Sequence, residues 1–431
     1  MNTEKSDIGN TAYNLVKELY PICRSITGDG VRRTLDILKH HIPLQVNEIE
    51  TGRDVFDWTI PKEWNIRDAW IKNESGKKIV DFQHSNLHVL NYSLPVHKEV
   101  SLQELKEHLF TIPEHPEWIP YRTSYYNETW GFCIPHNLFE QLSDEKYEVF
   151  IDSTLAEGQL TYGEYYIKGE TPDEVLISCH ICHPSLCNDN LAGIAMSVLL
   201  ARHLSRKPRR YSYRFVYIPG TIGSITWLSM NETKVDHIKH GLVVACVGDG
   251  GAFHYKKSRR ADAEIDQAVQ NVLKHSGQSY QVIDFFPFGY DERQYCSPGF
   301  NLPVGCLMRT PHGEYPEYHT SADNLDFVKP QYIEESFDMY RSVIRCLEEN
   351  RTYLNQLPKC EPQLGRRGLY SAIGGDANSR TLQLAILWVL NLSDGDHSLL
   401  DISVQSGMDF RMIARVTDIL LSKGLLTVKE G

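Results

Sequence analysis

The stretch Val175–Gly193 reads VLISCHICHPSLCNDNLAG and decides how the whole chain is interpreted. Its first four residues form an apolar run of the kind that a buried parallel strand uses. Asp189-Asn190 then precedes Leu191–Met196, a pattern that predicts a helix with an Asx residue at its start. Between the predicted strand and the predicted helix lie His180, His183 and Asp189. In α/β proteins ligands bind at such a turn, so the search for a site begins here.

Strand and helix patterns alternate from about residue 147 to residue 350. Further strands are predicted at Glu148–Ile151, Tyr213–Ile218, Leu242–Val247 and Pro303–Met308. Helices are predicted between them at Ile194–Leu204, Ile222–Met230, Asp262–His275 and Tyr332–Arg351. This alternation predicts an α/β fold in which a mostly parallel central sheet is flanked by helices.

Two other regions differ in texture from this alternation. Residues 46–134 are rich in tryptophan and tyrosine and contain a turn signal at Asn73–Gly76, so we predict an inserted β-rich domain there. The α/β domain is then formed by residues 1–45 and 135–357. Gly365, Gly368 and Gly374-Gly375 mark a linker.

Residues 365–431 show three helical patterns and a strand-like end, which is the outline of a winged helix. The helices are predicted at Thr381–Leu392, Leu399–Gly407 and Phe410–Leu421. A winged helix suggests DNA binding, yet residues 361–431 hold seven Lys and Arg against eight Asp and Glu. Because a DNA reader needs a positive face, we expect a packing or partner-binding module instead.

Composition narrows the function classes. The chain has 431 residues and a formal charge of −12, which argues against nucleic acid or an anionic membrane as a partner. There is no run of eighteen apolar residues and no apolar signal core at the N-terminus. The ten cysteines are therefore expected to be reduced thiols in a cytoplasmic protein.

Further candidate ligands follow later strands. Asp249 comes after the predicted strand Leu242–Val247, and His319 follows Pro303–Met308. A parallel sheet brings the carboxyl ends of its strands together, so His180, Asp189, Asp249 and His319 can converge. Two imidazoles and two carboxylates suit zinc, which polarises a carbonyl and acidifies water, as amide hydrolysis requires.

These residues resemble those of the zinc aminopeptidase and glutaminyl cyclase superfamily. More closely, the chain resembles a bacterial family of aminopeptidase-like proteins that are often encoded among polysaccharide-biosynthesis genes. The resemblance runs through Leu19–Gly28, Asp57–Trp64, Trp130–Cys133, the central stretch and Glu314–Asp326. It implies a peptidase-like domain, a β-rich insertion and a C-terminal winged helix.

The resemblance also implies roles for single residues. His180 matches the first zinc-ligand histidine, Asp189 the carboxylate that bridges two metals, and His319 the last histidine ligand; Asp249 is a further metal candidate. Two departures matter. The aspartate normally found two residues after the first histidine is Cys182, and the Glu-Glu pair that supplies a general base and a second-metal ligand is replaced by Pro219–Ser224. One zinc ion is therefore expected rather than two.

The missing glutamates leave the general base open. Glu292 and Glu317 are the candidates we assign, with Asp291 and Glu314 as alternatives within reach of the same loops.

Each remaining candidate has a functional and a structural interpretation. Arg293 would clamp a substrate carboxylate or form an internal ion pair. Thr221 lies in a helix-starting turn that would meet a substrate anion or simply cap the helix. Tyr126 would wall a pocket or pack within the insertion. His183 is interpreted as a loop-shaping residue, with ligation as the alternative, and Asp249 has the alternative of turn chemistry.

The expected function is a zinc-dependent, aminopeptidase-like amide hydrolase. It would act on a peptide or N-acyl bond of a small molecule or short peptide, as the family context implies for an intermediate of surface-polysaccharide synthesis. The alternative is a non-catalytic metal- or ligand-binding scaffold that has lost its general base. A homo-oligomer is a further expectation.

Overall fold

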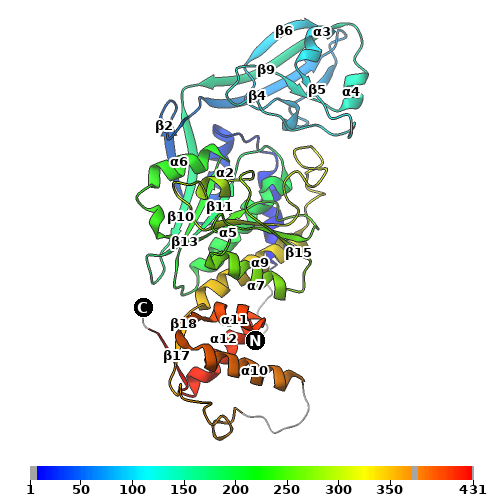
Figure 1. The fold of residues 1–431 in the computed structure, drawn as a ribbon. Helices are drawn as coiled ribbons and strands as arrows, with labels where there is room; N and C mark the ends of the chain where they lie inside the picture. The colour runs from blue at the N-terminus through cyan, green and yellow to red at the C-terminus, as the bar shows by residue number, and fades with distance from the viewer. Residues whose placement is uncertain (1–6, 370–376, 430–431) are drawn as a thin grey trace. The chain divides into compact units, whose positions relative to one another are not determined.

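The computed structural model describes residues 7–369 and 377–429, and the chain forms two compact units (Figure 1). The first unit comprises Met1–Arg260 and Ile283–Phe337, and the second comprises Ala261–Val282 and Asp338–Gly431. The predicted linker glycines Gly374-Gly375 lie outside the described residues. None of the helices in the described part of the chain combines the length and the apolar character that a membrane crossing requires.

A mixed eight-stranded sheet carries the predicted strand of the central stretch near its middle. Its strand order is β1-β10-β12-β11-β13-β16-β14-β15. The strands are β1 (Gln45–Glu50), β10 (Gln159–Ile167), β12 (Ser212–Ile218), β11 (Glu174–His180), β13 (Ile238–Val244), β16 (Val304–Met308), β14 (Phe253–Lys256) and β15 (Tyr280–Ile283). The four inner strands run parallel, whereas β1, β10 and β14 pair antiparallel. The predicted α/β fold is confirmed.

Helices cover this sheet, and all seven residues of β11 are buried (Figure 1). The helices are α1 (Ile8–Leu19), α2 (Asp29–Lys39), α5 (Ala192–Ser205), α6 (Ile222–Asn231), α8 (Glu292–Tyr295) and α9 (Pro330–Glu349). On one face, Ser197 of α5 donates to the Tyr217 hydroxyl of β12; on the other, Tyr295 of α8 lies 2.9 Å from Ser178 of β11. A strand covered on both faces is apolar throughout, which explains the run at Val175–Ser178.

A second, antiparallel sheet lies in the β-rich part of the first unit. Its order is β5-β4-β9-β6, formed by β5 (Lys78–Asp81), β4 (Glu63–Lys72), β9 (Lys146–Ala156) and β6 (Val96–Ser101). The predicted turn Asn73–Gly76 joins β4 to β5, and Gly76 donates its N–H to the Asn73 carbonyl (2.8 Å) with a φ of +80°. This β-rich part also contains two short strand pairs and two helices. The pairs are β2 (Asp54–Val55) with β3 (Trp58–Thr59) and β7 (Leu109–Phe110) with β8 (Phe132–Cys133), and the helices are α3 (Leu102–Glu107) and α4 (His136–Glu140).

The strand predicted at Glu148–Ile151 belongs to this second sheet and not to the central one. It is part of β9, which pairs with β4 and β6. Its burial alternates, with Tyr147, Val149 and Ile151 inside and their neighbours partly exposed. Such alternation marks a strand with one solvated face, as antiparallel sheets have, so the assignment to the central parallel sheet was wrong.

The second unit contains the predicted winged helix. Its elements are α7 (Glu264–His275), β17 (Thr352–Asn355), α10 (Ala377–Leu392), β18 (Asp394–Ser398), α11 (Leu399–Ser406), α12 (Phe410–Ser422) and β19 (Leu426–Val428). The three predicted helices are confirmed as α10, α11 and α12, and β17 lies between β18 and β19 in a three-stranded sheet. Ser398 and Asp401 form a capping box at the start of α11.

Candidate metal centre

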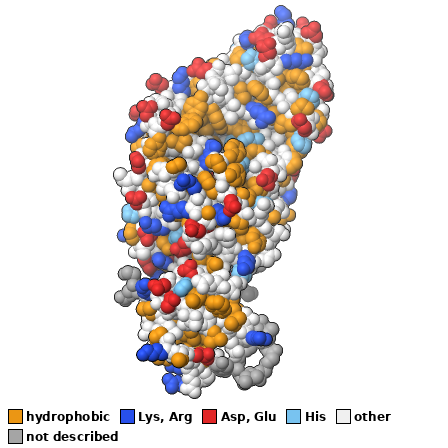
Figure 2. Space-filling view, in the orientation of Figure 1, with side chains coloured by type: hydrophobic (Ala, Val, Ile, Leu, Met, Phe, Trp, Pro, Cys, Tyr) orange, Lys and Arg blue, Asp and Glu red, His pale blue; other side chains and the backbone are white. Residues whose placement is uncertain are grey.

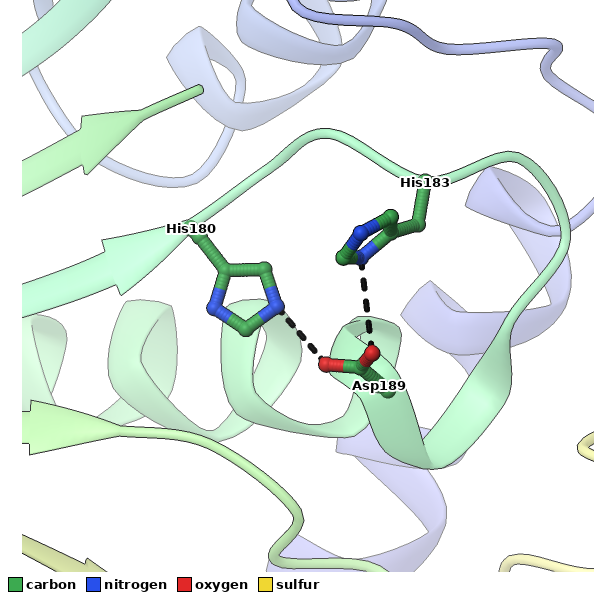
Figure 3. Close-up of side chains that lie close together, drawn as sticks. All are labelled: His180, His183 and Asp189. Atoms are coloured by element: carbon green, nitrogen blue, oxygen red, sulfur yellow. Dashed lines mark hydrogen bonds and ion pairs between the residues drawn. The ribbon is translucent and has the colours of Figure 1, made fainter. Parts of the chain in front are cut away.

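The turn between β11 and α5 gathers polar residues at the carboxyl end of the parallel strands. His180 is the last residue of β11, His183 lies in the loop, and Asp189 lies in the turn that leads into α5. In Figure 3 the imidazoles of His180 and His183 both point towards the Asp189 carboxylate. Asp189 is completely buried, and only 1% of His180 is exposed. The site is therefore built into the core of the first unit.

The carboxylate of Asp189 is the meeting point of three imidazoles. His180 Nε2 lies 2.8 Å from Oδ1, His319 Nε2 lies 3.0 Å from Oδ2, and His183 Nδ1 lies 3.5 Å from Oδ2. Burial by itself raises the pKa of the Asp189 carboxyl, but the surrounding imidazoles hold it well below its usual range. The convergence of His180, Asp189 and His319 expected from the sequence is thus present.

Two tyrosines hold these imidazoles in place. Tyr290 stacks on the ring of His180 at 4.8 Å and donates its hydroxyl to Asp189 Oδ1 (2.9 Å). Tyr318 stacks on its neighbour His319 at 4.0 Å. Aromatic packing of this kind restricts the rotation of a ring and so fixes the direction in which its nitrogen lone pair points.

The donor atoms fit a divalent cation. One ligand atom from each of His180, His183 and Asp189 can be chosen so that all three lie within 4.8 Å of one another. His183 Nδ1 is buried and makes no hydrogen bond within the described part of the chain. Burial lowers the pKa of His183 to about 3, so its imidazole is neutral and offers a lone pair. Two or three nitrogens and one carboxylate oxygen suit zinc among the common metals.

The loop that carries His183 is held by the N-terminal motif Leu19–Gly28. The guanidinium of Arg24, which is completely buried, donates to the carbonyls of His183 (3.2 Å) and Leu19 (2.8 Å). Ser185 donates its hydroxyl to the Tyr20 carbonyl (2.6 Å). This segment therefore shapes the site without contributing a ligand.

Asp323 fixes the backbone on the other side of the turn. Its carboxylate accepts the N–H groups of Asn188 (2.6 Å) and Asp189 (3.0 Å), and burial raises its pKa to about 8. Asp189 owes its orientation to this contact, because its backbone cannot shift without leaving a buried carboxylate unpaired.

The structure places Asp249 behind the site and apart from the imidazoles. Its oxygens accept hydrogen bonds from Asn188 Nδ2 (2.9 Å), Thr310 Oγ1 (2.6 Å) and the Gly251 N–H (2.7 Å). β13 ends at Val244, and the chain runs five residues further before it reaches Asp249. The carboxylate thus turns towards neutral donors and supports Asn188, in keeping with the alternative of turn chemistry.

A cavity of about 370 Å³ opens onto the imidazoles. Its described lining residues are Tyr121, Arg122, Thr123, Tyr125, His180, His183, Gly220, Thr221, Phe288, Gly289, Tyr290, Asp291, His312, Tyr318 and His319. Of the predicted substrate-binding residues, Thr221 is among them. Tyr126 and Arg293 are not, although Tyr125 and Asp291, which lie one and two residues before them, are. Arg293 instead lies over the exposed ring of Phe288 at 5.9 Å.

Asp291 is the carboxylic acid that lines this cavity. It is 1% exposed, and its Oδ1 accepts the hydroxyl of Ser224 (2.7 Å), while Oδ2 makes no hydrogen bond to the described residues. Burial raises its pKa to about 6. A Cβ atom at Gly220 would lie 3.2 Å from the Cβ of His180 and 3.6 Å from Asp291 Oδ2, so this glycine separates the acid from the first imidazole.

The two glutamates assigned as catalytic lie elsewhere. Glu292 is completely buried and pairs with Lys256 (2.8 Å), away from the cavity. Adjacent residues in a helical turn project about 100° apart, so only one of Asp291 and Glu292 can face the site. Glu317 is partly exposed and, like Glu314, is absent from the described lining of the cavity. The structure favours the alternative, Asp291.

Comparison with known proteins identifies the family of the chain. A family model described as a domain of unknown function (DUF4910) matches residues 13–350. The chain belongs to this family. A second model, described as a winged helix-turn-helix, matches residues 351–428 of this DUF4910 protein. The resemblance inferred from the sequence, including the C-terminal winged helix, is confirmed.

Individual relatives extend the comparison. A Clostridium acetobutylicum protein named "Putative polysaccharide biosynthesis protein with aminopeptidase-like domain" is 55% identical over 98% of this chain and 97% of its own length. The crystal structure of a "putative peptidase" from Clostridium acetobutylicum has a TM-score of 0.94 at 54% identity, covering 98% of this chain and 97% of its own. The zinc aminopeptidase of Bacillus subtilis shares the fold, with a TM-score of 0.57 at 12% identity over 78% and 94% of the two chains.

Two residues of this DUF4910 site were not assigned to it from the sequence. His183 was interpreted as loop-shaping, and Tyr290 received no role. His183 adopts a φ of +74°, which few residues with a side chain do, and this conformation directs its ring inward. The three-residue spacing from His180 was the available signal for His183. The sequence held no such signal for Tyr290, because its partner Asp189 lies 101 residues earlier in the chain.

Proposed function

We propose that this protein is a zinc-dependent amide hydrolase that cleaves a peptide or N-acyl bond of a small substrate. The observation that carries the proposal is the arrangement of three imidazoles around the buried Asp189, beside a cavity that also contains the Asp291 carboxyl group. The fold shared with a zinc aminopeptidase supports it. The name of the 55% identical relative supports a substrate that arises in polysaccharide biosynthesis.

His180, His183, Asp189 and His319 would hold the metal. We assign one ion, because the segment after β12 that would carry two glutamates is Pro219–Ser224, which contains no acidic residue. Zinc supplies Lewis acidity to such a site: it polarises a carbonyl group and makes a water molecule more acidic. The tyrosines Tyr290 and Tyr318 keep the imidazoles oriented.

Asp291 would move the proton. As the oxygen of water attacks the amide carbon, the free Oδ2 of Asp291 takes the proton that the water loses. The same oxygen then donates this proton to the nitrogen of the amine as the carbon–nitrogen bond breaks. A pKa of about 6 lets the acid do both near neutral pH. Ser224 fixes the carboxyl group by donating to its other oxygen.

The volume of the cavity argues for a small substrate. About 370 Å³ is in the range of sites for small molecules, and its walls are largely aromatic. We infer a small acylated or aminoacylated compound, or a short peptide, rather than a folded protein.

The test combines metal content with turnover. Full-length protein should bind close to one zinc ion per chain, and the loaded protein should hydrolyse at least one member of a panel of aminoacyl amides, N-acetyl sugars and N-acyl amino acids, with EDTA abolishing the activity. Asp291→Asn should lower kcat by about 100-fold or more with zinc retained. Glu317→Gln, which removes an acid outside the cavity, is the matched control. Zinc binding without any turnover would refute the proposal and support the non-catalytic scaffold.

For the second unit we propose a role in assembly rather than in nucleic-acid binding. On the face shown in Figure 2, its basic side chains are scattered among hydrophobic and acidic ones. Arg411 of α12 is paired with Asp409 (2.6 Å), which reduces the positive charge that this helix could offer to DNA. A homo-oligomer formed through this unit is the corresponding expectation, to be checked by light scattering.

A further inference from the structure

Arg122 is an arginine without an acidic partner in the wall of the cavity. Among the interactions of the described residues, its guanidinium makes one long hydrogen bond, from Nη1 to the Tyr121 carbonyl (3.4 Å), and no ion pair. Arg32, Arg214 and Arg309 of the first unit each pair with a carboxylate. Arg33 and Arg293, like the exposed Arg122, form no ion pair with the described residues, and what sets Arg122 apart is its place in the cavity wall. Arg122 also lines the cavity, so its charge is available to a bound molecule.

The backbone at Arg122 is fixed relative to the imidazoles. Tyr121 donates its N–H to the His319 carbonyl (2.7 Å), and Pro120 forms an isolated β-bridge with Thr320. On the other side, Asn91 donates its N–H to the Arg122 carbonyl (2.9 Å). The backbone of Arg122 therefore directly follows a residue, Tyr121, that is hydrogen-bonded to the candidate metal ligand His319. An anion bound by Arg122 would be held at a defined separation from the reacting bond.

The guanidinium of Arg122 is the group of the cavity wall best suited to a carboxylate. Of its described lining residues, Arg122 is the one Lys or Arg and Asp291 is the one acid. One guanidinium balances a carboxylate, and its two parallel N–H groups match the two carboxylate oxygens.

The same lining disfavours a free amino group as the recognised feature. Burying an ammonium group of a substrate is costly unless an acidic group pairs with it. Asp189 is occupied by the imidazoles, and Asp291 is buried and has the proposed role in proton transfer. The described lining residues offer no other acid.

We propose that Arg122 binds a carboxylate of the substrate, so that the preferred substrate is an amide that carries a free carboxylate, such as an N-acyl amino acid. This proposal rests on the proposed hydrolase function, whose substrate class it names. Arg122 thus makes the enzyme selective for acids over the corresponding neutral amides.

The experiment measures binding as well as turnover. The probes are N-acetyl-L-phenylalanine, its neutral amide N-acetyl-L-phenylalaninamide, and phenyl phosphate as the dianion. Their affinities for the full chain are measured by calorimetry with zinc and after its removal, which separates the contribution of Arg122 from direct contact of a carboxylate with the metal. The acid should bind about tenfold or more tightly than the amide in both forms.

Substitutions assign the preference to Arg122. Arg122→Gln should abolish it and leave the affinity for the neutral amide unchanged, and Arg122→Lys should retain part of it. Arg33→Gln, which removes an exposed arginine of α2, is the matched control. Circular dichroism and zinc content should stay as in the parent, since the one hydrogen bond of Arg122 is long.

Three outcomes would overturn the proposal. They are equal affinity for the acid and the amide, an acid preference that survives in Arg122→Gln, and tighter binding of phenyl phosphate than of the acid. None of them depends on turnover. An acid preference without hydrolysis would leave the Arg122 assignment standing and refute the hydrolase, whereas hydrolysis without a preference would do the reverse.

Discussion

The buried ion pair between Lys256 and Glu292 offers the sharpest test of how the cavity wall is held. Both side chains are at most 1% exposed, and Lys256 Nζ lies 2.8 Å from Glu292 Oε1. Lys256 also donates to the carbonyl of Phe288 (2.6 Å) and lies 4.1 Å from the ring centre of Phe286. Glu292 Oε2 makes no hydrogen bond to the described residues, so Lys256 is its main compensation.

Removing the lysine should therefore cost far more than removing the pair. Lys256→Met leaves a buried carboxyl group without its partner and frees the Phe288 carbonyl, for which we expect a loss of about 3–5 kcal/mol in the free energy of unfolding. Replacing both residues, Lys256→Met with Glu292→Leu, removes the uncompensated charge. The free energy of unfolding of the double variant should lie within about 1–2 kcal/mol of that of the parent. The remaining difference comes from the Phe288 carbonyl, which loses its hydrogen-bond donor.

Urea unfolding of the full chain, followed by tryptophan fluorescence, measures both effects. The single and double variants with Glu292→Leu complete a double-mutant cycle, and a coupling energy of about 2 kcal/mol or more is expected. The loop anchored by this pair carries Tyr290 and Asp291, so the double variant should also bind zinc less tightly. A Lys256→Met protein within 1 kcal/mol of the parent, or a double variant no more stable than that single one, would refute the reasoning.

Three further predictions concern metal binding, the loss of stability at acidic pH and the winged helix. Zinc at about 100 times its Kd should raise the free energy of unfolding by about 2.7 kcal/mol, and His183→Ala should remove most of that gain in thermal scans; an equal gain in the variant would exclude His183 as a ligand. Burial lowers the pKa of His240 to about 3, against about 6.5 in the unfolded chain, so the unfolded state binds more protons between these values. Its contribution to stability is complete above pH 6.5 and is lost as the pH falls towards 3, with a slope of up to about 1.4 kcal/mol per pH unit that His240→Leu should remove from urea titrations. The full chain should pass through a double-stranded DNA column at about 0.1 M salt without retention; salt-dependent retention would show that the second unit reads nucleic acid.

The local pattern of the chain was enough to predict most elements and the first three candidate ligands. The apolar run before His180 indicated a buried parallel strand, and the patterns at Thr381–Leu392, Leu399–Gly407 and Phe410–Leu421 indicated helices, because burial imposes its period on the sequence. His180, Asp189 and His319 were selected by their places after predicted strands together with the resemblance to zinc aminopeptidases. The alternation in Tyr147–Ile151 was equally visible, yet its sheet was misassigned, since one strand carries no record of its neighbours.

Tertiary structure alone decided which polar side chains share the cavity. Asp291 and Glu292 are adjacent and chemically alike, but one faces the imidazoles and the other pairs with Lys256, because a turn of helix points them in different directions. Asp249 and His183 are also placed by distant partners. Hydrogen bonds from Asn188 and Thr310 engage the carboxylate of Asp249, and a loop held by Arg24 brings His183 next to Asp189. Sequence patterns record which faces are buried, whereas the direction of a polar side chain in a turn depends on partners far along the chain.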